Sequence, residues 1–377
     1  MPGKCDNSAD SDYFCKTLNL QLNMKHEQLT SRAVELLKHL IATPSVSRNE
    51  EQAANVMEQA VRELGFQPQR EANNVWTIDP HFNTNRPTLL LNAHIDTVKP
   101  VATWTRNPYC PMQEDDIIYG LGSNDCGGGL VSLLQVYAWL TDHEQSYNVV
   151  YLASAEEEVS GKDGISRALP MLPPIDVAVV GEPTGMQPAI AEKGLMVLDV
   201  VTRGVSGHAA RGEGVNAIYE AIEDLCWLRS HRFKKESEFL GPTVMNVTVI
   251  KAGTQHNVVP DKCEMVVDVR TNEFYQNEFV FEFIKKHLKS DVTARSFRLH
   301  SSHIDPEHPL VKRCKEMGMV PYGSPTLSDQ ALMSFPSFKL GPGESSRSHS
   351  ADEFIRISEI DQAIDTYIKL FDGASIR

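Results

Sequence analysis

The sequence lacks the features that would place the chain in a membrane, on nucleic acid or among disulfide-rich secreted proteins. No apolar run approaches the length of a membrane span, and the first residues lack the charged-then-apolar layout of a secretory signal. The seven cysteines form no CxxC pair and are odd in number, which favours a reduced, cytoplasmic protein. A net charge of -14 disfavours attraction to phosphate backbones or anionic lipids. We therefore expect no nucleic-acid or membrane partner.

The sequence also contains no internal repeat, low-complexity tract or coiled-coil heptad pattern. Its apolar content of 41% and charged content of 23% are those of an ordinary globular protein. A length of 377 residues exceeds the usual single domain, so two domains are expected. Residues 1–23 are polar and aperiodic, and we interpret them as a disordered extension outside the fold.

Helical patterns and short apolar runs alternate along the first half of the chain. Helices are expected at 29–40, at 50–64 and from the glycines at 127–129 to Leu140, and strands at 75–78 and 88–93. This alternation predicts an α/β fold with a mixed, mainly parallel sheet covered by helices.

The pattern changes after Pro188, where strands become longer and alternate between apolar and polar residues. Expected strands are 195–202, 244–250 and 263–270, and expected helices are 214–230 and 276–288. The last signals, a strand at 337–340 and a helix at 357–371, fit the first domain again. We therefore predict an α+β domain at 188–297, inserted between residues 24–187 and residues 298–377 of one discontinuous domain.

The most informative residues are acids and histidines that follow buried strands. They are His94, Asp96, Asp125, the run Glu156 to Glu158, Glu182 and His349. Apolar runs at 88–93, 149–155 and 177–180 precede most of them, so these side chains should gather at one edge of the sheet. One bridging carboxylate with a histidine and a carboxylate on either side can hold two ions, and carboxylates with imidazoles suit zinc or cobalt. A spare glutamate beside such ions can activate water.

Each of these positions has a plainer interpretation when it is taken alone. A lone His-x-Asp is usually a strand-end pair, and three glutamates in a row are usually a solvated helix face. The glutamates here follow a buried strand, however, where three adjacent acids would repel one another without a cation. Cys126 is better explained as a small buried apolar residue than as a ligand.

Seven segments resemble, in the same order, those of the M20 family of metallopeptidases and deacylases. They are LLLNAHIDTV, YGLGSNDCGGG, SAEEEVSG, VVGEPTG, RGVSGHAARGEGVNAI, NVTVIKAGTQHNVVPDKCEMVVDVR and GPGESSRSHSADEFI. The resemblance runs from about Met24 to the C-terminus. Within the family, the chain looks most like the branch of acetylornithine deacetylase and succinyl-diaminopimelate desuccinylase.

The resemblance implies a role for each residue of the acid and histidine set. His94 and Glu182 would bind one metal ion, Glu158 and His349 would bind the other, and the bridge would be Asp125. Asp96 would accept a hydrogen bond from the second nitrogen of the His94 ring and fix its tautomer. Glu157 would be the general base, with Glu156 in a supporting role.

The inserted domain would act as a lid and dimerisation domain in a homodimer. The resemblance implies that His208 reaches the partner's metal site and stabilises the oxyanion of the tetrahedral intermediate. Asn257 and Arg270 match positions that bind the substrate carboxylate, for which the planar fork of arginine is suited. A helix-capping loop histidine and an interdomain salt bridge are the structural alternatives for His208 and Arg270.

The expected reaction is removal of a small acyl group from the α-amino group of an amino acid. N-acetylornithine or N-acetylcitrulline, in arginine biosynthesis, is the first choice of substrate. N-succinyl derivatives of ornithine, citrulline or diaminopimelate, and dipeptides, are alternatives. A succinyl group would need a cation, for which Arg347, Arg211 and Lys193 are candidates; the branch often has proline where Arg211 stands.

Overall fold

The computed structural model describes residues 26–377 as two compact units. The extension predicted at 1–23 lies outside the described residues. The first unit consists of the described residues up to Pro188 together with His308–Met319 and Lys339–Arg377. The second consists of Ala189–Glu307 and Val320–Phe338. Residues 298–307 and 320–338, which the sequence suggested for the discontinuous domain, thus group with the second unit.

The sheet of the first unit carries its strands in the spatial order β1-β2-β6-β3-β7. The strands are β1 (Gln69–Glu71), β2 (Asn74–Ile78), β3 (Thr88–His94), β6 (Asn148–Ser154) and β7 (Val177–Val180). β6, β3 and β7 are mutually parallel, whereas β1 and β2 run antiparallel. Every residue of these three parallel strands is buried, as expected where both faces of a sheet are covered. The predicted mixed, mainly parallel sheet is confirmed.

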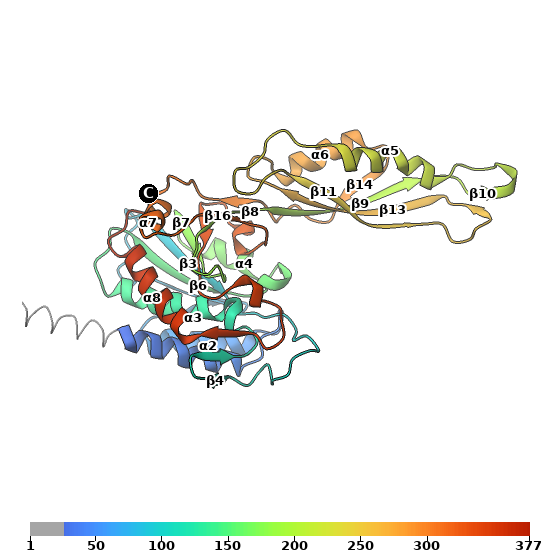
Figure 1. Ribbon diagram of the computed structural model, residues 1–377. Coiled ribbons are helices and arrows are strands. Elements are labelled where there is room, and N and C mark those ends of the chain that lie inside the picture. Colours follow the sequence, from blue (N-terminus) through green and yellow to red (C-terminus); the bar gives the residue numbers. More distant parts are fainter. Residues whose placement is uncertain (1–25) are drawn as a thin grey trace, which may run out of the picture. The chain divides into compact units, whose positions relative to one another are not determined.

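Helices cover this sheet on both faces. They comprise residues 26–41, α2 (Glu51–Glu63), α3 (Gly128–Thr141), α4 (Ile165–Ala168), α7 (Pro309–Glu316) and α8 (Ile357–Phe371). α3 packs against β3, β6 and α8, and it is buried almost all round (Figure 1). The sequence pattern did not predict α7, which is short. No helix within residues 26–377 is both long and apolar enough to cross a bilayer.

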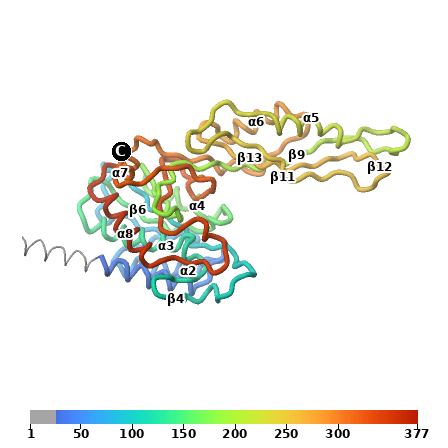
Figure 2. Tube along the Cα trace, in the orientation of Figure 1, coloured from blue at the N-terminus to red at the C-terminus, as the bar shows by residue number. Residues whose placement is uncertain are grey.

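The C-terminal residues return to the N-terminal part of the first unit. Figure 2 shows the red C-terminal trace beside the blue and cyan residues of that unit. One link is a small antiparallel sheet, in the order β18-β5-β4, of β4 (Met112–Glu114), β5 (Ile117–Tyr119) and β18 (Phe354–Arg356). Another is the Leu340 amide, which follows β17 (Ser337–Lys339) and donates to the Val180 carbonyl at 2.9 Å.

The second unit is built on an antiparallel sheet in the order β11-β13-β9-β14. Its strands are β9 (Gly194–Arg203), β11 (Val244–Ala252), β13 (Lys262–Thr271) and β14 (Asp291–Ala294). α5 (Ala217–Ser230) and α6 (Asn277–His287) lie on the same face of this sheet (Figure 1). Burial alternates along β9 and β13, because one face packs against the helices and the other faces outward.

Two smaller groups of strands complete the second unit. β10 (Gly207–His208) pairs with β12 (Val258–Val259) in an antiparallel ribbon. β8 (Ala189–Glu192) pairs with β15 (Ser302–His303) and β16 (Tyr322–Ser324).

Candidate metal centre

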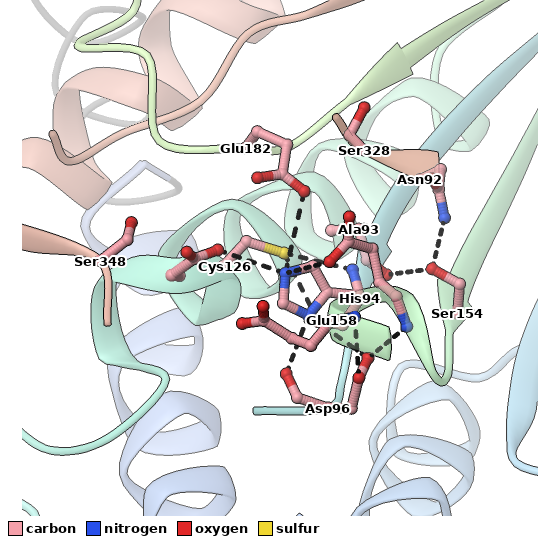
Figure 3. Close-up of polar contacts among 12 residues, drawn as sticks. Asn92, Ala93, His94, Asp96, Cys126, Ser154, Glu158, Glu182, Ser328 and Ser348 are labelled. Atoms are coloured by element: carbon pink, nitrogen blue, oxygen red, sulfur yellow. Dashed lines mark hydrogen bonds and ion pairs between the residues drawn. The ribbon is translucent and has the colours of Figure 1, made fainter. Parts of the chain in front are cut away.

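Three parallel strands deliver acids and a histidine to one edge of the first unit's sheet. His94 is the last residue of β3, Glu157 and Glu158 stand just after β6, and Glu182 stands just after β7. β3 is hydrogen-bonded to both β6 and β7, so their carboxyl ends are adjacent. In Figure 3 the Glu182 and Glu158 side chains both point toward the His94 ring. The edge predicted from the sequence therefore brings these side chains together.

Asp125 lies between two histidines that come from distant parts of the chain. It stands in the turn Ser123–Gly127, which leads into α3, and the peptide bond to Cys126 is cis. Its Oδ1 lies 3.3 Å from Nε2 of His94, and its Oδ2 lies 3.6 Å from Nε2 of His349. One carboxylate thus presents a different oxygen to each imidazole, which is the arrangement that a bridging ligand requires.

The remaining carboxylates divide between these two histidines. Oε2 of Glu158 lies 2.9 Å from Nε2 of His349, and Oε1 of Glu182 lies 3.8 Å from Nε2 of His94. Glu157 adds an oxygen 4.0 Å from Nε2 of His94. Donor atoms from Asp125, Glu158 and His349 all lie within 4.8 Å of one another. The five residues predicted as ligands therefore lie together at this edge.

The burial, hydrogen bonding and pKa shifts of the donors at this edge suit the binding of a cation. Oε1 of Glu182 is buried and accepts no hydrogen bond, which is costly unless an ion meets it. Burial, and after it the nearby Asp125 charge, raises the pKa of Glu182 to about 8. The hydrogen bond to Glu158 is the main cause that raises the pKa of His349 to about 9. A divalent cation would stabilise the charged carboxylates and displace the imidazole proton, so the residues fit such an ion.

Asp96 contacts the His94 ring through both its backbone oxygen and its carboxylate. Nδ1 of His94 lies 2.8 Å from the backbone oxygen of Asp96 and 3.5 Å from its carboxylate, so the carbonyl is the closer partner. The Asp96 carboxylate accepts the backbone N–H groups of Glu157 and Glu158 at 3.0 and 3.1 Å. The hydroxyl of Ser47 also donates to it, at 2.7 Å. The Asp96 carboxylate remains within 3.5 Å of the imidazole, and this contact contributes to raising the pKa of His94 and lowering that of Asp96.

Cys126 is buried beside the His94 backbone. Its Sγ accepts from the His94 amide at 3.2 Å, and burial raises the pKa of the thiol far above its usual value. Sγ also lies within 4.8 Å of ligand atoms of His94 and Glu182. A thiol that burial keeps protonated suits the predicted role of a small apolar residue.

Three further residues support the centre without having been predicted. The Glu353 carboxylate accepts backbone N–H groups of the turn that carries Asp125. The Asn124 side chain forms hydrogen bonds to the segment before His349. The Ser47 hydroxyl donates to the Asp96 carboxylate. The only signal in the sequence was the position of Glu353, four residues after a predicted ligand. Burial raises the pKa of Glu353 to about 7, although the three N–H groups that it accepts act in the opposite direction.

His208 and Asn257 lie next to each other in the second unit. β10 places His208 opposite Val258, and the Asn257 carbonyl accepts the Ala209 amide at 3.1 Å. Nδ1 of the exposed His208 ring accepts the Ala210 amide at 3.2 Å, so the histidine does cap a short turn. A neutral ring whose Nδ1 accepts carries its proton on Nε2, which is then a hydrogen-bond donor.

Two arginines predicted to read substrate carboxylates are already paired within their own units. Arg270 binds the carboxylate of Asp268, two residues earlier on β13, at 2.8 and 3.2 Å. Arg347 forms a bidentate pair with Glu359 at 2.8 and 2.9 Å, and its guanidinium lies over the Phe354 ring. A substrate carboxylate would therefore compete with Asp268 for Arg270 and with Glu359 for Arg347, and substrate binding by either arginine stays a prediction.

The other two candidate cations lie in the second unit. Arg211 is exposed at the end of the turn that His208 caps. Nζ of Lys193 donates to the Pro242 carbonyl at 3.1 Å. Burial, and after it the charge of Arg270, lowers the pKa of Lys193.

Two family models match parts of the chain. The peptidase dimerisation domain of the M20 group matches residues 190–294, and peptidase family M28 matches residues 73–168. The first match covers most of the second unit, including α5, α6 and the four-stranded sheet.

Curated relatives match over most of the chain. Acetylornithine deacetylase from Erwinia tasmaniensis is 29% identical over 358 residues, which cover 85% of this chain and 92% of the relative. The proteins of that name from Pectobacterium carotovorum and Proteus mirabilis are 28% and 27% identical, and 85% and 87% of this chain is covered. The resemblance to the M20 family is confirmed. These relatives carry the name of the acetylornithine deacetylase branch, which the chain resembles in its sequence motifs.

Solved structures of peptidases share the fold, and one of them is described as an M20 peptidase. A tripeptidase from Staphylococcus aureus superposes with a TM-score of 0.70 at 19% identity, covering 91% of this chain and 97% of that one. A dinuclear metal-binding M20 peptidase from Bacillus subtilis gives 0.69 at 17% identity, covering 91% and 98%. By its similarity to the acetylornithine deacetylases the chain is an enzyme, consistent with a metal-dependent hydrolase of linear amides, and its described residues include candidate ligands for divalent ions.

Proposed function

We propose that the protein is a two-metal amidohydrolase that removes an acetyl group from the α-amino group of an amino acid, with N-acetylornithine as the first substrate to test. The observation that carries the two-metal part is the position of Asp125, whose two oxygens face His94 and His349. The relatives named acetylornithine deacetylase support the substrate class. The native metal is zinc or cobalt in this proposal, because the donors are carboxylates and imidazoles.

Glu157 is the general base in the proposed mechanism. Bound metal ions would polarise the scissile carbonyl and make a water molecule acidic. Glu157 takes the proton from that water and later delivers it to the leaving amine. Asp96 keeps the base in place, because its carboxylate holds the backbone N–H groups of Glu157 and Glu158. Oε2 of Glu157 lies 4.0 Å from Nε2 of His94, so the base borders the centre.

His208 supplies the proposed oxyanion donor. Its Nδ1 accepts a backbone N–H, which leaves the proton on Nε2 available to the negatively charged oxygen of the tetrahedral intermediate. In the proposal this donor comes from the partner subunit of a homodimer. The short turn that His208 caps fixes the tautomer and is therefore compatible with catalysis.

Exposed apolar side chains on the second unit support association through this unit. β11 is the edge strand of the four-stranded sheet, and Val249 and Ile250 on it are 41% and 52% exposed. On α5, Tyr219 and Ile222 are 68% and 49% exposed. An open sheet edge with apolar side chains favours pairing with another chain. The match to a peptidase dimerisation domain covers these residues and supports the same arrangement.

Mixing two inactive variants tests whether His208 acts across subunits. A His208→Ala chain lacks the donor and a Glu157→Gln chain lacks the base, but a mixed dimer has one site with both. After subunit exchange at equal amounts, about a quarter of the wild-type activity should return, because half of the dimers are mixed and each has one competent site. Activity is measured together with the molecular mass, before and after mixing. If mixed dimers form and the activity does not return, His208 does not act in trans.

A substrate panel tests the proposed reaction. Purified protein loaded with Zn²⁺ or Co²⁺ is assayed on the N-acetyl and N-succinyl derivatives of ornithine, citrulline and diaminopimelate, and on dipeptides. We expect the highest kcat/KM for N-acetylornithine, with N-acetylcitrulline next. A preference for succinyl derivatives would replace the acetyl assignment, and a preference for dipeptides would make the protein a peptidase. Loss of all activity on removal of metal by a chelator is expected in every case.

A further inference from the structure

Glu353 joins two segments of the first unit that each carry a candidate ligand. Its carboxylate accepts the backbone N–H groups of Asn124 and Asp125, both at 2.9 Å, and of Gly122 at 3.1 Å. Only 2% of Glu353 is exposed, so water does not compete for these bonds. Glu353 itself stands four residues after His349. A single carboxylate therefore fixes the turn that bears Asp125 to the segment that bears His349.

Asn124 makes a second connection between the same segments, and here the side chain comes from the turn and the backbone groups come from the segment before His349. Its side-chain oxygen accepts the Glu344 amide at 3.0 Å, and its side-chain nitrogen donates to the Glu344 carbonyl at 3.1 Å. The same nitrogen lies 3.3 Å from the hydroxyl oxygen of Ser348, which directly precedes His349. The side chain is fully buried. The segment before His349 and the segment after it are thus both tied to the turn 122–125.

Asp352, which directly precedes Glu353, connects the same segment to residues 105 and 106. The Asp352 carboxylate accepts the backbone N–H groups of Thr105 and Arg106, both at 3.0 Å. His349 and Asp352 have positive φ values of 58° and 53°, a conformation that costs free energy and needs support from neighbouring groups. The bonds to Asp352 and Glu353 supply that support, so the backbone around His349 is held from two directions.

We propose that Glu353 is a positioning residue that sets the site of the ion bound by Asp125, Glu158 and His349. It touches neither substrate nor ion, and it acts by fixing how the Asp125 carboxylate faces the His349 ring. The inference rests on the two-metal centre proposed above. It predicts that the two ion sites respond unequally to a change at Glu353, since His94 and Glu182 are carried by β3 and by the end of β7.

Glu353→Gln is the most informative substitution. Glutamine is nearly the size of glutamate, but it replaces one acceptor oxygen by an NH₂ group that faces backbone N–H groups. Aspartate keeps the charge and the acceptors on a shorter side chain, so Glu353→Asp should recover part of the function. Asp224→Asn is a matched control in the second unit, because Asp224 is also buried and accepts two backbone N–H groups, those of Lys289 and Ser290 at 3.0 Å.

Cobalt titration of the metal-free full-length protein, followed by visible absorption, tests the proposal. In wild type we expect two Co²⁺ ions per chain. In Glu353→Gln one ion should bind as in wild type and the other about 10 to 100-fold more weakly, as found for residues that orient metal ligands. Glu353→Asp should lie between the two. Asp224→Asn should bind both ions normally, even if its melting temperature falls as much as that of Glu353→Gln.

Each outcome of the titration decides between the positioning role and its alternatives. If Glu353→Gln melts at a lower temperature but binds both ions with wild-type affinity, Glu353 is only structural and the proposal is wrong. If both ions weaken equally in Glu353→Gln, the selective role is wrong. If wild type itself binds fewer than two ions, the two-metal centre fails first and this inference fails with it.

Discussion

Glu157→Gln is expected to lower kcat about a thousandfold while leaving the bound metal unchanged. Glutamine has the same shape but cannot accept a proton, and a general base typically contributes about 10² to 10⁴ in rate. The metal content should persist because Asp125, Glu158, Glu182 and the two histidines remain. The measurement combines steady-state kinetics on N-acetylornithine, or on the best substrate of the panel, with metal analysis of the same sample.

Glu156→Gln is the matched control for this prediction. Glu156 is the adjacent acid, but its side chain turns toward the Asp163 amide, which it accepts at 3.2 Å. A glutamine oxygen can accept the same hydrogen bond, and Glu156→Gln alters no proton acceptor at the centre. The kcat of Glu156→Gln should therefore change less than about threefold. Near-native kcat in Glu157→Gln, or an equal loss in both variants, would show that the base is another group.

Asp125→Ala is expected to abolish activity and to remove both ions. The Asp125 side chain faces both histidines, so its loss removes one donor from each ion and lets the remaining carboxylates repel one another. Metal analysis after dialysis against metal-free buffer should find well below one ion per chain. Glu182→Ala, which removes a ligand of one ion only, is the comparison and should retain part of the metal.

The pair of variants also tests the bridge itself. If Asp125→Ala loses no more metal than Glu182→Ala, Asp125 serves a single ion and the bridging role is wrong. Circular dichroism of the metal-free proteins is needed alongside, since a folded metal-free variant shows that the loss arises at the centre. We expect Asp125→Ala to be folded, because the Asp125 carboxylate faces a polar edge rather than the apolar core.

The residues at strand ends were predictable because two simple patterns coincide there. Apolar runs of four to seven residues mark β3, β6 and β7, and the residue type changes abruptly to His94, Glu157 and Glu182 where each strand ends. Parallel strands bring these ends to one edge, so the sequence order alone predicts proximity. Asp125 and His349 lie on turns, and only the family resemblance connected them with the edge.

The supporting contacts were not predictable in the same way. Asp96 and Glu353 hold backbone N–H groups, and such groups carry no residue type that a sequence pattern could reveal. The pair of Arg347 with Glu359 was not predicted either, because Glu359 lies twelve residues away at the start of α8, where the capping geometry and not the sequence spacing places it. A sequence pattern does not reveal whether an internal carboxylate already pairs with an arginine that is a candidate for substrate binding.

The bonds between the turn 122–125 and Glu353 have a consequence for the order in which the protein becomes competent during synthesis. Asp125 and Glu353 are 228 residues apart, so most of the chain must emerge from the ribosome before the turn acquires its partner. His349, four residues earlier, arrives at the same late stage. A nascent chain that already contains His94, Asp125 and Glu182 therefore lacks a finished two-ion site, and complete loading is a late event.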